Sequence, residues 1–338
     1  MPQVHAQRRL AAILAADVVG YTRLMEERTA SERGVSWLVE GSVRKVGNRI
    51  RITAQLSEGA TGGHVWAEQY DRELTDVLKM QDEITRTIVA QLEVKLLPDE
   101  MRAIAKAPTN VVDAYTAYLK GLDLFRLKTG TSLMCARQMF VRAIELDPDY
   151  AEAYAQLAQV LSELRSLYGE NIAVADIIAE TDRALCPNPD LAQAFVSRGR
   201  AYMTNGQKPD ARQALDRALS LDPANLDAHN QFGRYFMQTG DFEASARHYR
   251  RAMEIQPEEY VAPVMVLQAL QALGRGDEAL AYARIGVRRA EDIQRQQPEN
   301  SRPAQMLCAS YAYLGATTKA MEWLDRTIAI DPDDNGVR

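Results

Sequence analysis

A short block of residues that ends in proline recurs along the last two-thirds of the chain, and it constrains the fold more than any other feature. Successive copies lie 41, 34, 34, 41 and 34 residues apart, which is a 34-residue period with seven-residue insertions in two copies. A fixed period of this length is typical of an array in which each repeat is one supersecondary unit. The copies read RAIELDP, RALCPNP, RALSLDP, RAMEIQP, RQQPEN and RTIAIDP, and their prolines are Pro148, Pro189, Pro223, Pro257, Pro298 and Pro332.

Each repeat is predicted to be a helical hairpin. Glycines such as Gly206 and Gly240 permit the turn between two helices, because glycine adopts left-handed backbone at little cost. Proline then ends the second helix, since it has no amide hydrogen to donate. One hairpin cannot bury its own apolar face, so neighbouring hairpins must stack. In the repeat that ends at Pro223, the residues predicted to fill the contact between the two helices are Phe195, Gly199, Tyr202, Ala211, Leu215 and Ala218.

This spacing of small and aromatic residues resembles the tetratricopeptide repeat family. Two further copies keep it, at Gly233, Phe236, Gly240, Tyr249 and Ala252 and at Tyr311, Gly315, Ala320 and Leu324. The resemblance implies a mostly α fold, with a superhelix of about six hairpins over residues 101–338 preceded by a small α/β remnant. It also implies a non-catalytic protein-interaction module that binds a protein or peptide on the concave face, which the first helix of each repeat lines.

Polar residues recur on the predicted concave face. Arg200 and Arg234 are one 34-residue period apart, and Asn230, Gln268 and Gln159 lie close to the same line. Two guanidiniums on neighbouring helices can hold a carboxylate or an acidic peptide through bidentate hydrogen bonds. The predicted peptide site is therefore Arg200, Asn230, Arg234 and Gln268. The alternative is that both arginines face solvent or pair with nearby Glu and Asp residues.

Residues 10–21 predict a buried strand that leads into a Gly-Tyr turn. The text AAILAADVVGYTRLMEE resembles the opening strand of class III adenylate and guanylate cyclases, in which the aspartate that matches Asp17 ligates two catalytic metal ions. Two divalent cations need more than one carboxylate, and no Gly-Asp hairpin follows at the family's spacing. We therefore expect residues 1–30 to be a remnant of that domain with Asp17 as a vestigial metal ligand. The alternative role for Asp17 is a polar residue at a strand end.

Residues 35–70 predict a three-stranded antiparallel meander with a two-residue turn at Gly47-Asn48. This turn places Arg44 opposite Arg51, a repulsive pair that Glu40, Glu58 or Glu68 could offset. The text resembles the second half of a TolB-like linker domain, so residues 31–100 are expected to be a partial copy, with a deletion joined near 27–34. The helix expected to close it carries Met80, Ile84, Ile88, Leu92 and Leu96.

The composition of the chain excludes several classes of partner and location. The formal charge of −6 lacks the basic footprint of a nucleic-acid-binding protein, so no nucleic-acid partner is expected. Three dispersed cysteines fit a cytoplasmic location, and no apolar run is long enough to span a membrane. We expect no enzyme activity and no cofactor. The alternative is an adenylate cyclase that forms cyclic AMP from ATP with magnesium or manganese in cyclic-nucleotide signalling, and a third possibility is a non-functional relic.

Overall fold

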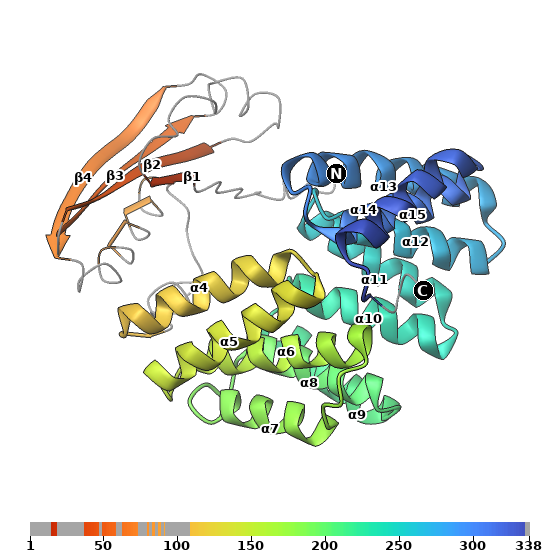
Figure 1. Cartoon of the computed structure of the whole chain (residues 1–338), viewed down its shortest axis with the longest axis horizontal. Coiled ribbons are helices and arrows are strands. Elements are labelled where there is room, and N and C mark those ends of the chain that lie inside the picture. Colours follow the sequence, from red (N-terminus) through yellow and green to blue (C-terminus); the bar gives the residue numbers. More distant parts are fainter. Residues whose placement is uncertain are drawn as a thin grey trace, which may run out of the picture. The chain divides into compact units, whose positions relative to one another are not determined.

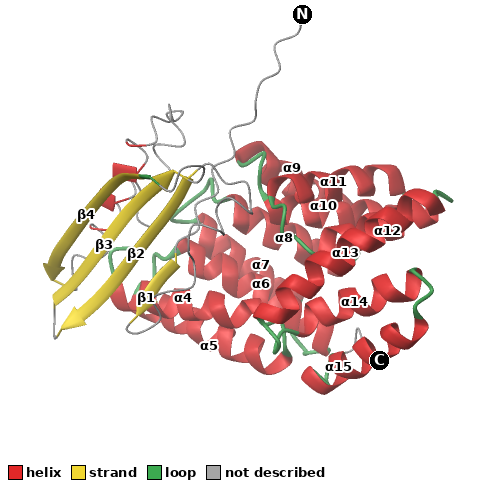
Figure 2. Cartoon of the chain, turned by 90° about the horizontal axis from the view of Figure 1, so that it is seen from above, coloured by secondary structure: helices red, strands yellow, loops and turns green. Residues whose placement is uncertain are grey.

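The computed structural model describes residues 15–18, 37–46, 49–58, 63–73, 80, 83–84, 87–88, 91 and 109–334. The chain divides into two units, Met1–Val112 and Asp113–Arg338 (Figure 1). The first contains strands and the second is helical (Figure 2). No helix in the described ranges is both long and apolar enough to cross a lipid bilayer.

The first unit holds a four-stranded sheet in the order β1-β2-β3-β4. The predicted meander is confirmed, because β2 (Trp37–Val46), β3 (Arg49–Glu58) and β4 (His64–Glu73) pair antiparallel. The short strand β1 (Ala15–Val18) adds to β2 in parallel. Strands from the predicted segments 1–30 and 31–100 thus share one sheet.

One face of the sheet carries a small apolar cluster. Ile50 and Tyr70 are buried there with Met80, and Ile84 packs against them. Met80, Ile84 and Ile88 are helical, as expected of the closing helix, whereas 92, 96 and the proposed junction at 27–34 lie outside the described residues.

The carboxylate that pairs with Arg51 on the sheet is not the one predicted from the sequence. Arg44 does pair with Arg51 in register, which confirms the predicted turn. The carboxylate that contacts Arg51 is Asp71 on β4, at 2.7 Å, and not one of the three glutamates predicted. The reason is register, since β4 places Asp71 directly opposite Arg51.

The second unit confirms the predicted array, with six helical hairpins between residues 109 and 334. They follow one another from α4 to α15 (Figure 1), and each second helix ends just before one of the repeated prolines. The pairs are α4 (Val112–Arg126) with α5 (Gly130–Leu146), α6 (Ala151–Tyr168) with α7 (Val174–Leu185), α8 (Ala192–Thr204) with α9 (Lys208–Leu221), α10 (Leu226–Thr239) with α11 (Phe242–Ile255), α12 (Val261–Ala272) with α13 (Gly276–Gln296), and α14 (Ser301–Tyr313) with α15 (Thr317–Ile330).

The two insertions fall in different places. In the fifth hairpin α13 has 21 residues where α11 has 14, which is an extension of two turns. In the second hairpin α6 has 18 residues and a five-residue connection, 169–173, leads to α7. Both insertions lengthen one hairpin and leave the order of stacking unchanged.

Small residues set the spacing of the paired helices. A Cβ atom built on Gly199 would lie 2.8 Å from the Leu215 side chain, and one on Gly233 would lie 2.5 Å from the Tyr249 ring. Only glycine allows α8 and α10 to approach their partners this closely.

The array also closes on itself, because its first two hairpins touch the last one. Tyr168, at the end of α6, donates its hydroxyl proton toward Asp331 after α15, at 2.5 Å. Asn300, before α14, donates to the backbone carbonyl of Arg126 at the end of α4, at 3.0 Å. These contacts join residues 163 and 174 positions apart in the chain.

Candidate functional site

The helical unit encloses a cavity of about 720 Å³. Its wall includes residues of the first helices α4, α6, α8 and α10, together with the segment that precedes α14. A cavity of this size suits a short stretch of polypeptide or a small molecule. Of the four residues predicted to bind a peptide, Arg200, Asn230 and Arg234 line it, as does Gln159.

Gln268 lies elsewhere. It is exposed on α12 and is not part of the cavity wall. The 34-residue period counts it as equivalent to Arg234, and the register is kept in α12, because Ala262 is fully buried 34 residues after the fully buried Ala228. An equivalent position in the repeat therefore does not by itself place a side chain on the cavity wall.

Arg200 is one of three charged groups that contact each other. It is buried, with 5% of its surface exposed, and its Nη1 donates to Oε1 of Glu163 at 2.8 Å. Lys128 Nζ donates to the same oxygen at 3.2 Å. Burial alone would raise the pKa of Glu163, but the charges of Arg200 and Lys128 hold it well below its ordinary value. This carboxylate is therefore ionised and shared by two cations.

Lys128 occupies an unusual backbone position. Its φ of 56° is left-handed, and no other non-glycine residue in the described ranges has a positive φ. It stands two residues before a second helix, where four other hairpins have Gly206, Gly240, Gly274 and Gly315, with φ between 72° and 83°. A side chain in this conformation costs about 1–2 kcal/mol.

Three contacts offset that cost at Lys128. Its Nζ lies 3.1 Å from the centre of the Phe125 ring as well as near Glu163, and its carbonyl accepts the Tyr168 hydroxyl at 3.0 Å. Burial lowers the pKa of Lys128, although the Glu163 charge opposes this. The lysine thus directs a cation into the cavity from a turn that the other hairpins build with glycine.

Arg234 is different from Arg200. It lines the cavity, yet within the described part of the chain no hydrogen bond or ion pair joins its side chain to another residue. Burial and the nearby charges of Arg200 and Arg302 lower the pKa of Arg234 to about 10. The second cation predicted from the repeat period therefore lacks the carboxylate partner that Arg200 has.

Several polar atoms on the cavity wall are also unpaired. They are buried and have no hydrogen-bond partner in the structure, and they comprise Oε1 of Gln156, Nε of Arg200, Oδ1 of Asn230 and Oε1 of Gln231. An amide group can present either its oxygen or its N–H₂ to a ligand by rotating. An unpaired buried polar atom costs about 1–3 kcal/mol, so this wall is suited to a polar ligand.

Sequence reasoning missed most of the charged residues of this cavity, including Lys128, Glu163 and Arg302. The position of Lys128 carried a signal, because it interrupts the row of turn glycines. Arg302 carried none, since only the closure of the array brings the sixth hairpin to the wall.

Asp17 lies in β1, and its backbone pairs with Ser42 of β2. Its side chain lies outside what the structure describes. Within the described ranges, no three His, Cys, Asp or Glu side chains gather as metal ligands would.

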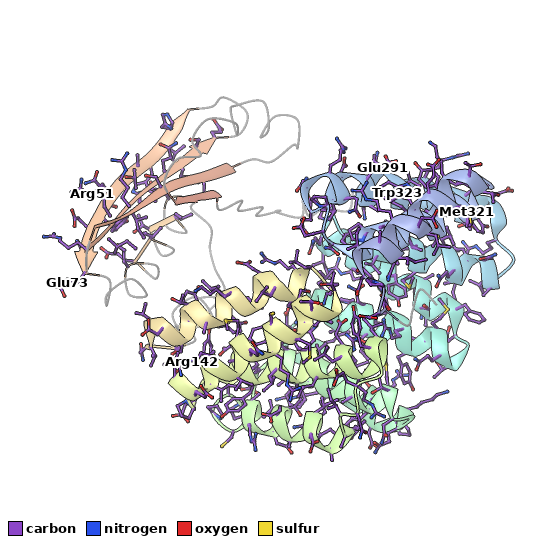
Figure 3. The ribbon with its side chains drawn as sticks, viewed as in Figure 1. Arg51, Glu73, Arg142, Glu291, Met321 and Trp323 are labelled. Carbon is purple, nitrogen blue, oxygen red and sulfur yellow. The ribbon has the colours of Figure 1, made fainter. Side chains whose placement is uncertain are left out.

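A second, smaller hollow of about 410 Å³ lies near the end of the array. Glu291 and Gln294 of α13 line it with Trp323 of α15, and Met321 of α15 is 52% exposed (Figure 3). Tyr311 of α14 lies beside this hollow, next to Glu291. Tyr311 donates its hydroxyl proton to Glu291 at 2.7 Å, so these two polar groups already have a hydrogen-bond partner.

Comparisons with known proteins agree with the helical fold. The family model described as tetratricopeptide repeat matches residues 196–260. A monomeric variant of IFIT1, solved with m7Gppp-AAAA, is similar at a TM-score of 0.51 and 15% identity, over 75% of this chain and 55% of that one. YrrB, a TPR protein with an unusual peptide-binding site, is 24% identical over 59% of this chain and 94% of its own, with a TM-score of 0.34. The stacked helical hairpins, together with the family-model match at residues 196–260, give the helical unit a tetratricopeptide-type fold.

A curated relative bears on the resemblance to adenylate cyclases. "Putative adenylate cyclase 3" of Rhizobium meliloti (strain 1021) is 37% identical over 188 residues, which is 56% of this chain. The chain spans 30% of the length of that relative.

Proposed function

We propose that this protein is a cytoplasmic, non-catalytic interaction module that holds an acidic segment of a partner protein inside its superhelix. The observation that carries the proposal is the cavity, in which the Arg234 cation and several buried amide atoms lack partners. Tetratricopeptide-type folds present such concave surfaces for extended ligands. The family-model match at residues 196–260 covers Arg200, Asn230 and Arg234, which supports the same reading.

The test uses defined peptides and the full chain. Fluorescein-labelled hexaglutamate is expected to bind, and labelled hexaglutamine, which matches it in length without the charge, is expected not to bind. Fluorescence anisotropy measures both. Binding should weaken as salt rises, because ions screen the attraction between charges. Equal affinity for the two peptides would contradict the proposal.

The second candidate function is adenylate cyclase activity, which the name of the Rhizobium meliloti relative favours. In this chain the resemblance to the catalytic domain of class III cyclases rests on about 20 residues around Asp17, so the proposal treats residues 1–30 as a remnant of that domain. We expect no cyclic AMP from ATP with magnesium or manganese. Turnover that disappears in Asp17→Ala would restore the enzyme.

A further inference from the structure

Five cations among the described residues line the cavity; Arg126 pairs with Asp123 on α4, and the other four fall into two groups. Lys128 and Arg200 share the carboxylate of Glu163, at 3.2 and 2.8 Å. Arg234 and Arg302 line the same cavity, and no carboxylate of the described chain lies within ion-pair distance of either. The first group is neutralised within the protein, and the second is open to an external anion.

Four other carboxylates of the described chain line the cavity, at Asp227, Glu258, Glu259 and Asp334. Asp227 accepts from Gln193 Nε2 at 3.2 Å, and Asp334 accepts from Gln305 Nε2 at 2.5 Å. Glu259 accepts from the backbone N–H groups of Val261 and Ala262 at the start of α12. Within the described residues, none of the four forms an ion pair with Arg234 or Arg302.

Arg302 is positioned by the closure of the array. It is the second residue of α14, and its backbone N–H donates to Oδ1 of Asn300, the residue that also binds the Arg126 carbonyl. Its Nη1 donates to Gln305 Oε1 at 2.8 Å, which leaves the remaining guanidinium donors available.

Arg234 and Arg302 face a common region. Burial raises the pKa of Tyr249 to about 12, and the charges of both arginines act on this tyrosine in the opposite direction. The charge of Arg302 also lowers the pKa of both Glu163 and Arg234. Because both guanidiniums line the same cavity as Tyr249, an anion bound there would be attracted to both of them.

We propose that Arg234 and Arg302 form an anion-binding subsite for a carboxylate or phosphate group, with the amides of Asn230 and Gln231 as additional donors. Gln231 is only 8% exposed and its Oε1 has no partner. This oxygen is an acceptor, so the amide donates to an anion after the rotation that exchanges Oε1 and Nε2, and the same holds for Asn230. Arg200 is not part of the subsite, because Glu163 occupies it. That the ligand is a peptide rests on the proposed function, whereas the subsite itself does not.

The first experiment measures binding of labelled hexaglutamate to the full chain. Arg234→Gln and Arg302→Gln are each expected to weaken binding at least about 10-fold, as expected for loss of a charge-assisted bidentate contact. Arg302→Lys should weaken it less, because lysine keeps the charge but loses the planar pair of donors. The matched control is Arg142→Gln, an arginine on α5 whose side chain is 57% exposed. Thermal melts should show that both cavity variants stay folded.

The second experiment separates the subsite from the peptide. Inorganic phosphate and acetate are added to unlabelled protein, and the melting temperature is followed, since a ligand that binds the folded state raises it. A rise in the wild type and in Arg142→Gln but not in Arg302→Gln supports the subsite, and the stronger of the two ions identifies its chemistry.

The outcomes distinguish the two proposals. Hexaglutamate binding that Arg302→Gln leaves unchanged would overturn the subsite while the interaction module survives. An Arg302-dependent response to phosphate or acetate without any peptide binding would keep the subsite and overturn the peptide ligand. Absence of both responses would overturn both.

Discussion

In two places in this molecule a single carboxylate holds two cations, and the two places differ in their access to water. On the sheet, Asp71 contacts Arg49 at 3.0 Å and Arg51 at 2.7 Å, and the two arginine side chains are 71% and 52% exposed. In the cavity, Glu163 contacts Arg200 and Lys128 at similar distances, but the side chains of Arg200 and Glu163 are 6% and 9% exposed.

The comparison shows that distance alone does not give the energy of an ion pair. Water solvates the sheet residues whether or not they pair, so their pairing adds little to stability. The cavity residues have lost most of that solvation, so removing one partner leaves a buried charge that nothing compensates. Similar geometries should thus respond very differently to mutation.

The largest effect is expected from Glu163→Ala. It leaves Lys128 and Arg200 as unpaired cations in the interior, and we expect the free energy of unfolding to fall by about 3–5 kcal/mol. Urea denaturation of the full chain measures it. Glu163→Gln keeps the size of the side chain and should cost nearly as much, because the lost charge and not the lost volume is responsible. If Glu163→Ala lowered the free energy of unfolding less than Asp71→Ala does, burial would not be what separates the two ion pairs.

Gly199→Leu tests the apolar contact beside Arg200 on the same helix. Its Cβ would already lie 2.8 Å from Leu215 and 3.3 Å from the Ala211 carbonyl, so the two helices must separate. We expect a loss of about 1–3 kcal/mol or more by thermal or urea denaturation. Arg234→Ala is the reference, because it removes a cation with no partner. Equal melting temperatures for these two variants would mean that the contact is not close.

Acid should act on the cavity more than on the sheet. The pKa of Glu163 is lowered in the folded state, so its stabilisation is complete above the unfolded value of about 4.3 and is lost as the pH falls below it. The loss is at most about 1.4 kcal/mol per pH unit. The stability difference between wild type and Glu163→Gln should therefore shrink between pH 5 and 3 on the order of that slope. A difference that stays constant would contradict an ionised Glu163.

The smallest effect is expected from Asp71→Asn. Arginine hydrogen bonds lower the pKa of Asp71 in the same direction as that of Glu163, but the group is solvated. We expect no measurable change in melting temperature, either at low salt or at high salt. A clear loss would show that the sheet depends on its surface charges.

The array could be predicted from sequence because the evidence for it is repeated six times. Each copy places a proline after its second helix, and four place a glycine in its turn, so one irregular copy does not obscure the rest. The sheet was predictable where a turn fixes register, as at Val46 and Arg49, which pair as expected. The partner of Arg51 was not, because it depends on the register of a third strand.

The site was predictable only in part, for a similar reason. The period brings Arg200 and Arg234 to neighbouring helices, and both line the cavity. It says nothing of contacts across the array, so Arg302 was missed. Glu163 was missed although it lies on neighbouring α6, because it stands one turn after Gln159, the position that the period aligns with Arg200. The period also fails at Gln268, which keeps the 34-residue register but is exposed on α12 and does not line the cavity.

The bonds from Tyr168 to Asp331 and from Asn300 to the Arg126 carbonyl change how the array should come apart. An open stack of repeats frays from its ends, because each terminal hairpin has only one neighbour. Here the terminal hairpins are also neighbours of each other. Amide protons of α4 and α15 should therefore exchange with solvent in one cooperative opening, since neither end can leave without exposing the other.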